Sequence, residues 1–344
     1  MEDKGSLDML VIKTTQIAGF RKKSHKQDQF VHIAFKDLKS FMMGTLQFLV
    51  QVIEKGKSIF SETIRSSRYG IKDIVYFRPL NCYLISMSQA IYRKDIDGKH
   101  PYRYMNIDCG SKDGACFAVS QGHKKLLVNK DWRQILVVDP RKKHIEMLLE
   151  KKYIGYIYDF RILQKAEDQV AAVTEDGYVL LYTLNISKRL VLSRSDVLLD
   201  LIAEREEICK KVAACPKGDY LLVELTRNRS SPYCSRVALI QVVRNTLVLK
   251  LVINYWNRGM PEKMALNCYG YFEGKAIFVG LISGSEGVVQ LYELDPEEER
   301  LKELKEKRVP HHELNPLRLH KLKGSFYYMG SFMKLMRLDI NLDD

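Results

Sequence analysis

The basic side chains of this sequence are its clearest candidates for chemistry, and that chemistry is the binding of anionic groups. Residues 21–26 read Arg-Lys-Lys-Ser-His-Lys and form the densest cluster. Two further groups lie in polar stretches between apolar runs. Arg and Lys at this density bind phosphates or acidic protein surfaces. The candidate partner-binding cations are Arg21, Lys22, Lys23, Lys26, Lys124, Lys125, Arg141, Lys142 and Lys143. Ordinary solvated loops are the alternative interpretation.

The charge is concentrated in the N-terminal half. Residues 1–160 contain 28 Lys and Arg against 17 Asp and Glu, so they hold +11 of the formal charge of +13. This asymmetry predicts a basic surface that meets a partner protein with an acidic surface. Nucleic acid and anionic lipid are the other partner classes that it leaves open.

Signatures of catalysis and of metal binding are missing. The sequence has no Gly-x-Ser-x-Gly elbow, and its seven cysteines include no Cys-x-x-Cys pair. His311, His312 and His320 have no further ligands at zinc-site spacing. We therefore expect no enzyme activity, no cofactor and no metal. An odd number of cysteines and the lack of an apolar membrane span or secretory start favour a cytoplasmic location, with the nucleus left open.

A repeated unit organises most of the chain. Six predicted hairpins, each of two apolar strands around a polar turn, end their second strands at Lys94, Asp139, Thr183, Gln241, Glu293 and Arg337. The intervals are 45, 44, 58, 52 and 44 residues, and strand-like segments flank each hairpin. Four strands recurring at about 40–45 residues predict an all-β fold, a β-propeller of six visible blades or of seven.

The third strand of this unit resembles a degenerate WD40 repeat. Residues 288–294 read Val-Val-Gln-Leu-Tyr-Glu-Leu, with Tyr where that family has Trp, and Asp139 keeps the family's Asp. The family's Gly-His before the first strand is absent. The resemblance implies a WD-repeat β-propeller that serves as a non-enzymatic protein–protein interaction scaffold. The alternative is a propeller that binds nucleic acid or phosphoinositide through its basic loops.

Three segments are predicted along the chain. Residues 67–344 form the propeller, whose last hairpin lacks an outer strand. Residues 1–35 are expected to close the ring, because Leu10–Thr14 and Phe30–Ala34 both suit a strand that covers the open edge. Residues 36–66 are an amphipathic helix, spanning 36–57, and its connector.

The predicted helix adds a second candidate surface. Apolar residues at spacings of three and four, among them Phe41 and Leu49, form one stripe. That stripe either packs on the propeller or docks a partner or a second copy of the chain. A charged segment at Glu297–Arg308 also has helical i,i+4 pairs, and a helix or an extension of a sheet edge fits it.

Overall fold

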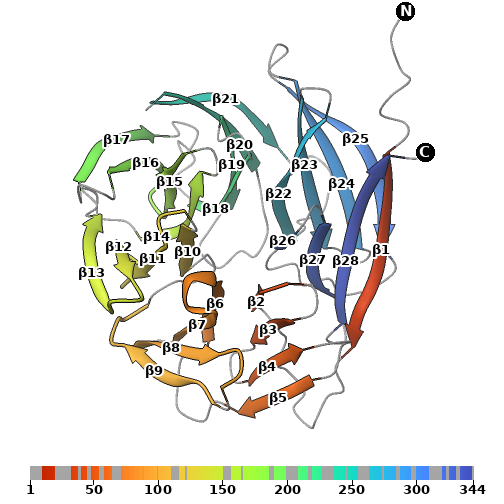
Figure 1. Ribbon diagram of the computed structural model, residues 1–344. Helices are drawn as coiled ribbons and strands as arrows, with labels where there is room; N and C mark the ends of the chain where they lie inside the picture. The colour runs from red at the N-terminus through yellow and green to blue at the C-terminus, as the bar shows by residue number, and fades with distance from the viewer. Residues whose placement is uncertain are drawn as a thin grey trace, which may run out of the picture. The chain divides into compact units, whose positions relative to one another are not determined.

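The structure is a computed structural model, and almost everything it describes is β-strand (Figure 1). Among the described residues, one short 3-10 helix, η1 at Arg78–Leu80, is the exception. The structure describes residues 10–19, 32–37, 40–44, 48–53, 58–63, 71–87, 89–98, 100–109, 116–120, 122–149, 156–163, 166–185, 190–198, 208–215, 219–226, 236–244, 246–254, 263–272, 275–283, 287–295, 300–309, 320–322, 325–330 and 334–342.

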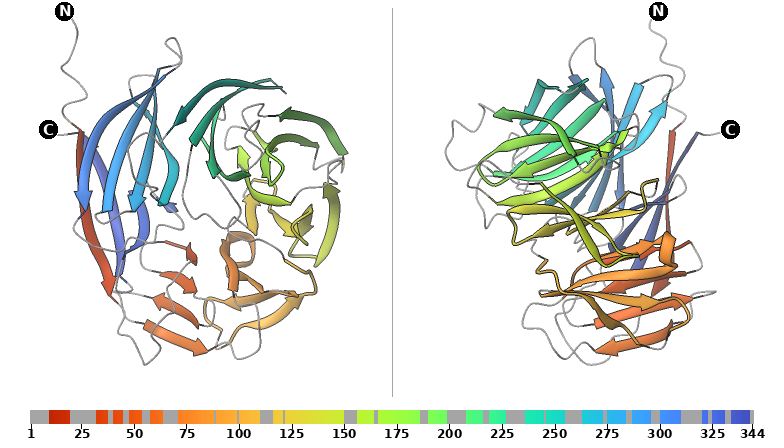
Figure 2. Two further views of the ribbon diagram at one scale, coloured as in Figure 1. Left: turned by 180° about the vertical axis from the view of Figure 1, so that it is seen from behind. Right: turned by 60° about the vertical axis from the view of Figure 1, so that its left-hand side comes forward.

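Within these residues the strands form seven four-stranded antiparallel sheets. In six of them the four strands follow one another in chain order, as in a series of hairpins. The seventh has the order β1-β28-β27-β26, so it joins strands from the two ends of the described chain. Figure 2 shows the strands from two further sides. The chain divides into two compact units, which are described separately.

The larger unit comprises residues 28–231 and 235–254. It contains five sheets, and each is a run of four consecutive strands. The first sheet holds β2 (His32–Phe35), β3 (Ser40–Gly44), β4 (Phe48–Ile53) and β5 (Ser58–Thr63). The second holds β6 (Ile71–Phe77), β7 (Cys82–Met87), β8 (Ala90–Asp95) and β9 (Tyr102–Met105). The third holds β10 (Phe117–Ser120), β11 (Lys125–Lys130), β12 (Gln134–Asp139) and β13 (His144–Leu149).

The last two sheets of the larger unit follow the same plan with longer strands. The fourth holds β14 (Ile157–Leu163), β15 (Ala166–Thr174), β16 (Tyr178–Asn185) and β17 (Leu190–Leu198). The fifth holds β18 (Ile208–Ala214), β19 (Tyr220–Thr226), β20 (Arg236–Val243) and β21 (Thr246–Asn254).

The smaller unit comprises residues 1–27, 232–234 and 255–344. One of its two sheets holds β22 (Lys263–Phe272), β23 (Lys275–Ser283), β24 (Gly287–Asp295) and β25 (Arg300–Val309). The other holds β1 (Leu10–Gly19), β26 (His320–Leu322), β27 (Ser325–Gly330) and β28 (Lys334–Leu342).

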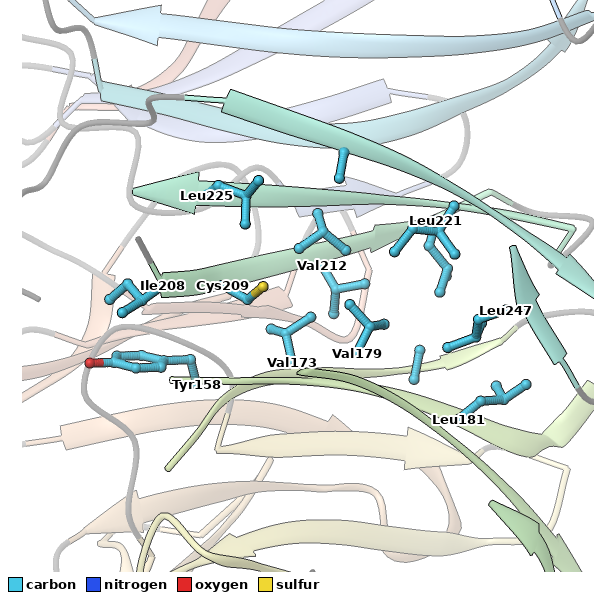
Figure 3. Close-up of a cluster of buried hydrophobic side chains, with 14 of the residues drawn as sticks. Tyr158, Val173, Val179, Leu181, Ile208, Cys209, Val212, Leu221, Leu225 and Leu247 are labelled. Atoms are coloured by element: carbon cyan, nitrogen blue, oxygen red, sulfur yellow. The ribbon is translucent and has the colours of Figure 1, made fainter. Parts of the chain in front are cut away.

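The core of the larger unit lies between consecutive sheets. Leu126 and Val128 of β11 pack toward β6–β9, whereas Leu127 between them packs toward β14–β17. Alternate residues of one strand thus enter two different clusters, and this is why the central strands are apolar at nearly every position. Figure 3 shows the next cluster, between β14–β17 and β18–β21, where the labelled side chains are Tyr158, Val173, Val179, Leu181, Ile208, Cys209, Val212, Leu221, Leu225 and Leu247.

Buried carboxylates also join neighbouring sheets. Asp73 follows a bulge in β6, and its Oδ2 accepts hydrogen bonds from the backbone N–H groups of Cys116 (2.8 Å) and Phe117 (3.0 Å). Asp159 follows the same kind of bulge in β14, and its Oδ2 accepts from the N–H of Val212 at 3.2 Å. Phe117 is the first residue of β10 and Val212 lies within β18, and each of these strands is the first of the next sheet. These hydrogen bonds therefore hold one sheet against its neighbour.

The strand predictions are confirmed where the structure describes them. All six predicted hairpins are adjacent antiparallel strands, from β7–β8 to β27–β28. Of the two N-terminal candidates, Leu10–Thr14 lies in β1, which pairs with β28 and places Leu10 opposite Leu342. Phe30–Ala34 does not share that sheet, because residues 32–35 form β2. The described part of the charged segment at Glu297–Arg308, residues 300–308, lies in the edge strand β25.

The helix predicted over residues 36–57 is wrong. Its described residues from Ser40 onward form β3 and β4, which pair with Ser40 opposite Ile53 and Phe41 opposite Val52. Ser40–Gly44 is buried at every position, so both faces of the strand are covered, and apolar residues then fall at helix-like spacings without forming a helix. A Cβ at Gly44 would lie 2.8 Å from Ile74 Cδ1, so the strand packs closely on β6.

Candidate partner-binding surface at the basic turns

The described basic candidates gather at one end of the β10–β13 sheet. Lys124 precedes β11 in the turn from β10, and Arg141, Lys142 and Lys143 form the turn from β12 to β13. In an antiparallel sheet these two turns lie at the same end, so Lys124 and the three cations of the second turn share that end of the sheet. The other four cations, Arg21, Lys22, Lys23 and Lys26, lie outside the described residues.

Left-handed backbone conformations shape both turns. Lys124 has φ 56° and Lys143 has φ 53°. In the second turn the N–H of Lys142 donates to Asp139 O at 3.2 Å, and the N–H of Lys143 donates to Pro140 O at 3.3 Å. All three lysine side chains, those of Lys124, Lys142 and Lys143, are exposed. The turns therefore present them to solvent on a hydrogen-bonded backbone.

Lys125 does not belong to this surface, and its prediction as a partner contact is corrected. Its side chain is nearly buried, and Nζ lies 2.9 Å from Asp139 Oδ2 and 2.6 Å from Glu146 Oε1. The three residues lie on β11, β12 and β13, so the ammonium joins three adjacent strands. A lysine held this way is engaged inside the sheet and offers no charge to a partner.

Asp139 is the centre of this network. Its buried carboxylate accepts hydrogen bonds from Arg141 through the backbone N–H (3.0 Å), Nε (3.1 Å) and Nη2 (2.8 Å). Burial alone would raise the pKa of Asp139, but the bonds from Arg141 and Lys125 outweigh it and hold the pKa well below its usual range. Arg141 is thus at the surface, with its charge already paired.

An aromatic side chain from the neighbouring sheet supports the second turn. Tyr104 of β9 donates its hydroxyl to Pro140 O at 2.6 Å, and Lys143 Nζ lies 4.7 Å from the centre of its ring. The guanidinium of Arg93 lies 5.4 Å from the same ring. Tyr102 meets Tyr104 edge-on at 6.2 Å and is 44% exposed. Lys143 thus lies over the buried ring of Tyr104, and the exposed ring of Tyr102 is the next neighbour of that ring.

These two tyrosines are not among the candidates that the sequence indicates. The signal was the alternation of Tyr102, Arg103 and Tyr104, which places both rings on one side of an edge strand. Their contact with the β12–β13 turn joins residues 36 positions apart in two different sheets. Only the packing of the sheets brings these elements together.

The second predicted surface, built on Phe41 and Leu49, is also corrected. Phe41 is 2% exposed in β3, and its ring lies 5.4 Å from that of Phe35. Leu49 is in β4 and is not on a helix. Without a helix there is no helical stripe to dock a partner, and the Phe41 side chain is part of the core.

Two negative observations apply to the described part of the chain. It contains no group of three or more His, Cys, Asp or Glu side chains arranged to hold a metal ion. Among the same residues, no helix is long and apolar enough to cross a membrane.

Comparison with known proteins identifies the fold. No family model and no curated protein sequence matches the chain. The WD40 repeats of RRP9 superpose with a TM-score of 0.67, covering 96% of this chain and 100% of that one at 9% identity. The chain has a WD40-like β-propeller fold.

Two further solved structures agree. U3-55K matches with a TM-score of 0.66 and 9% identity over 95% of this chain and 98% of its own. The β-propeller domain of Cps50 (Swd1) from Myceliophteria thermophila matches with a TM-score of 0.54 and 12% identity, over 76% of this chain and 83% of that one. Such low identities establish a shared fold only.

Proposed function

We propose that this propeller is a non-enzymatic scaffold that binds a partner protein through an acidic surface on that partner. The observation that carries the proposal is the WD40-like fold over nearly the whole chain, since a propeller offers wide loop surfaces on a rigid frame. The contact surface consists of Lys124, Lys142 and Lys143, which we name the basic turn surface.

The charge distribution around the turns supports this assignment. Lys125 and Arg141 are engaged by Asp139 and Glu146, so the four charges balance one another. Because these charges cancel, the positive potential at this surface comes from the exposed side chains of Lys124, Lys142 and Lys143. Charges of this kind increase the association rate with an acidic partner and select against basic ones.

A second candidate function rests on Tyr102. Its exposed ring contacts Tyr104, over which Lys143 Nζ lies at 4.7 Å. Single-stranded nucleic acid uses such a combination, with bases stacked on aromatics and phosphates near cations. The alternative is therefore a nucleic-acid or phosphoinositide-binding propeller. Its binding would fall steeply with salt, in proportion to the number of phosphates contacted.

The same proposal extends to the architecture. We take the seven four-stranded sheets of the described residues as seven blades of one ring, in which β1 supplies the outer strand of the last blade. Pairing of β1 with β28 covers what would otherwise be an open strand edge.

The test is affinity purification from cells that express the chain, with two double charge reversals. Lys124→Glu with Lys142→Glu alters the basic turn surface. Arg244→Glu with Lys302→Glu changes the charge equally at two exposed positions elsewhere. We expect the first variant to recover at least tenfold less partner, and the second to behave as the wild type.

Three results would overturn parts of the proposal. Recovery of the wild-type chain alone, as a stable monomer, contradicts the scaffold function. Equal losses in both double variants contradict the basic turn surface. Recovery that disappears after nuclease treatment, or binding to phosphoinositide vesicles that the first double variant abolishes, favours the alternative.

A further inference from the structure

A cavity of about 720 Å³ lies at the opposite end of the β10–β13 sheet from the basic turn surface. The turn from β11 to β12 forms one wall, with Asp131 and Trp132. Asp108, which precedes β10, and Tyr156, which precedes β14, form others. Three different connections of the larger unit therefore converge on it, as in many ligand sites.

The β11–β12 turn holds an unfavourable backbone conformation at this wall. Asp131 (φ 50°) and Trp132 (φ 61°) are consecutive residues in the left-handed conformation. The N–H of Arg133 donates a hydrogen bond to Lys130 O at 3.1 Å, and this bond closes the turn. Two-residue hairpin turns of this kind favour Asn-Gly or Asp-Gly, and a Trp in the Gly position costs about 1–2 kcal/mol. Strain of this kind is concentrated at functional sites.

Neighbouring groups fix the strained tryptophan in place. The N–H of Ile157 donates to Trp132 O at 2.6 Å, and the indole meets the ring of Tyr156 edge-on at 5.5 Å. The guanidinium of Arg133 lies 5.4 Å from the centre of the Tyr156 ring. One aromatic ring of this wall thus already faces a cation, while the neighbouring indole lines the cavity.

Two carboxyl groups complete the polar part of the wall. Burial raises the pKa of Asp108, and the negative charge of Asp131 and the hydrogen bond that the protonated Asp108 carboxyl donates to it raise the pKa further. The charge of Lys130 lowers the pKa of Asp108 by a smaller amount, and its Nζ lies 4.0 Å from Asp131 Oδ2. Asp108 thus experiences a net negative field from its neighbours, and a cation between the two carboxyl groups would relieve their repulsion.

We propose that this cavity binds the side chain of a lysine or arginine from a partner polypeptide. The ammonium or guanidinium lies between Asp108 and Asp131, and the methylene stem packs along Trp132 and Tyr156. The inference rests on the proposed scaffold function and adds a contact of opposite charge at the other end of the sheet. Lys72, Lys130 and Arg133 also line the cavity, so an anionic guest is the alternative that the test must separate.

The test is calorimetric titration of the full chain with four blocked pentapeptides, Gly-Gly-Xaa-Gly-Gly, in which Xaa is Lys, Arg, norleucine or Glu. Norleucine keeps an apolar stem without the charge. We expect the Lys and Arg peptides to bind with Kd of about 1 mM or tighter, and the norleucine peptide at least tenfold more weakly. Similar affinity for norleucine, no saturable heat with Lys or Arg, or tighter binding of Glu would overturn the proposal.

Three variants locate the binding. Asp131→Asn removes the charge and keeps a residue that tolerates positive φ, so its fold is preserved; we expect at least a tenfold loss of Lys-peptide affinity. Trp132→Phe should weaken binding several-fold, and Lys142→Gln at the other end should leave it unchanged. Full affinity in Asp131→Asn would overturn the site. A partner that is recovered equally by Asp131→Asn contradicts the cavity as its contact and leaves the scaffold function standing.

Discussion

Replacing Lys125 by Met should be among the most destabilising single changes in the β10–β13 sheet. Its Nζ forms ion pairs with two carboxylates, Asp139 at 2.9 Å and Glu146 at 2.6 Å, whose side chains are 0% and 8% exposed. Met retains the apolar stem and removes the charge. Two carboxylates then share the site with the guanidinium of Arg141 as the remaining partner.

The expected cost follows from this arrangement. Breaking a buried ion pair by removing one partner costs about 3–5 kcal/mol. Because Arg141 still neutralises Asp139, we expect the lower end, about 3 kcal/mol. Arg141→Gln should cost about 1 kcal/mol or less, since that side chain is 39% exposed. Lys302→Met, at an exposed position of β25, is the matched control and should cost less than about 0.5 kcal/mol.

The assay is urea unfolding followed by circular dichroism, at neutral and acid pH. The folded pKa of Asp139 lies below its unfolded value of about 3.9. Its contribution is therefore present above the unfolded pKa and is lost as the pH falls through the folded pKa. The difference in the free energy of unfolding between the wild type and Lys125→Met should therefore decrease as the pH falls below about 5. A loss under about 0.5 kcal/mol, or an equal loss in Arg141→Gln, would refute this account.

Three other outcomes are expected. Asp73→Ala removes the acceptor of the Cys116 and Phe117 N–H groups, so it should cost about 2–4 kcal/mol and speed hydrogen exchange at both amides; unchanged exchange would contradict the sheet-to-sheet role. Burial raises the pKa of Cys82 to about 12, so iodoacetamide at pH 8 should modify it only after unfolding, as peptide mass spectrometry can show. Lys124→Gly relieves a left-handed lysine, so the melting temperature should be equal or higher while partner binding falls.

The sequence predicts this fold well where strand signals are local. The turn at Thr174-Glu175-Asp176-Gly177 ends one apolar run and starts another, and Gly177 has φ 83° as the turn requires. Hairpins of this kind are set by residues within about 15 positions. The open edge of the last hairpin predicts a strand from residues 1–35, for which Leu10–Thr14 and Phe30–Ala34 are both candidates. The structure pairs Leu10–Thr14 with β28.

Residues 36–57 show where that reasoning fails. A strand covered on both faces has no alternation of apolar and polar residues, so Phe41, Met42 and Met43 are all buried in β3. Two short strands in succession can then place apolar residues at intervals that match a helix equally well. The fold of this segment depends on its packing on β6, and the local sequence pattern does not indicate that contact.

The position of Lys125 likewise depends on contacts between strands. Lys125 reads as one more lysine of a basic loop, but Asp139 and Glu146 lie 14 and 21 residues away on paired strands. Their distance from Lys125 depends on strand register. Lys142 and Lys143, in contrast, lie in the turn itself and are exposed.

The pairing of β1 with β28 also sets an order of folding. Gly19 and Lys334 are partners in the sheet, yet about 315 residues separate them along the chain. The whole of the larger unit lies between them, so during synthesis its five sheets can form while β1 waits without a partner. Forming those sheets first shortens the flexible chain that must be closed, and it lowers the entropic cost of the final pairing. Until β28 has been made, the edge of β1 needs protection from other chains.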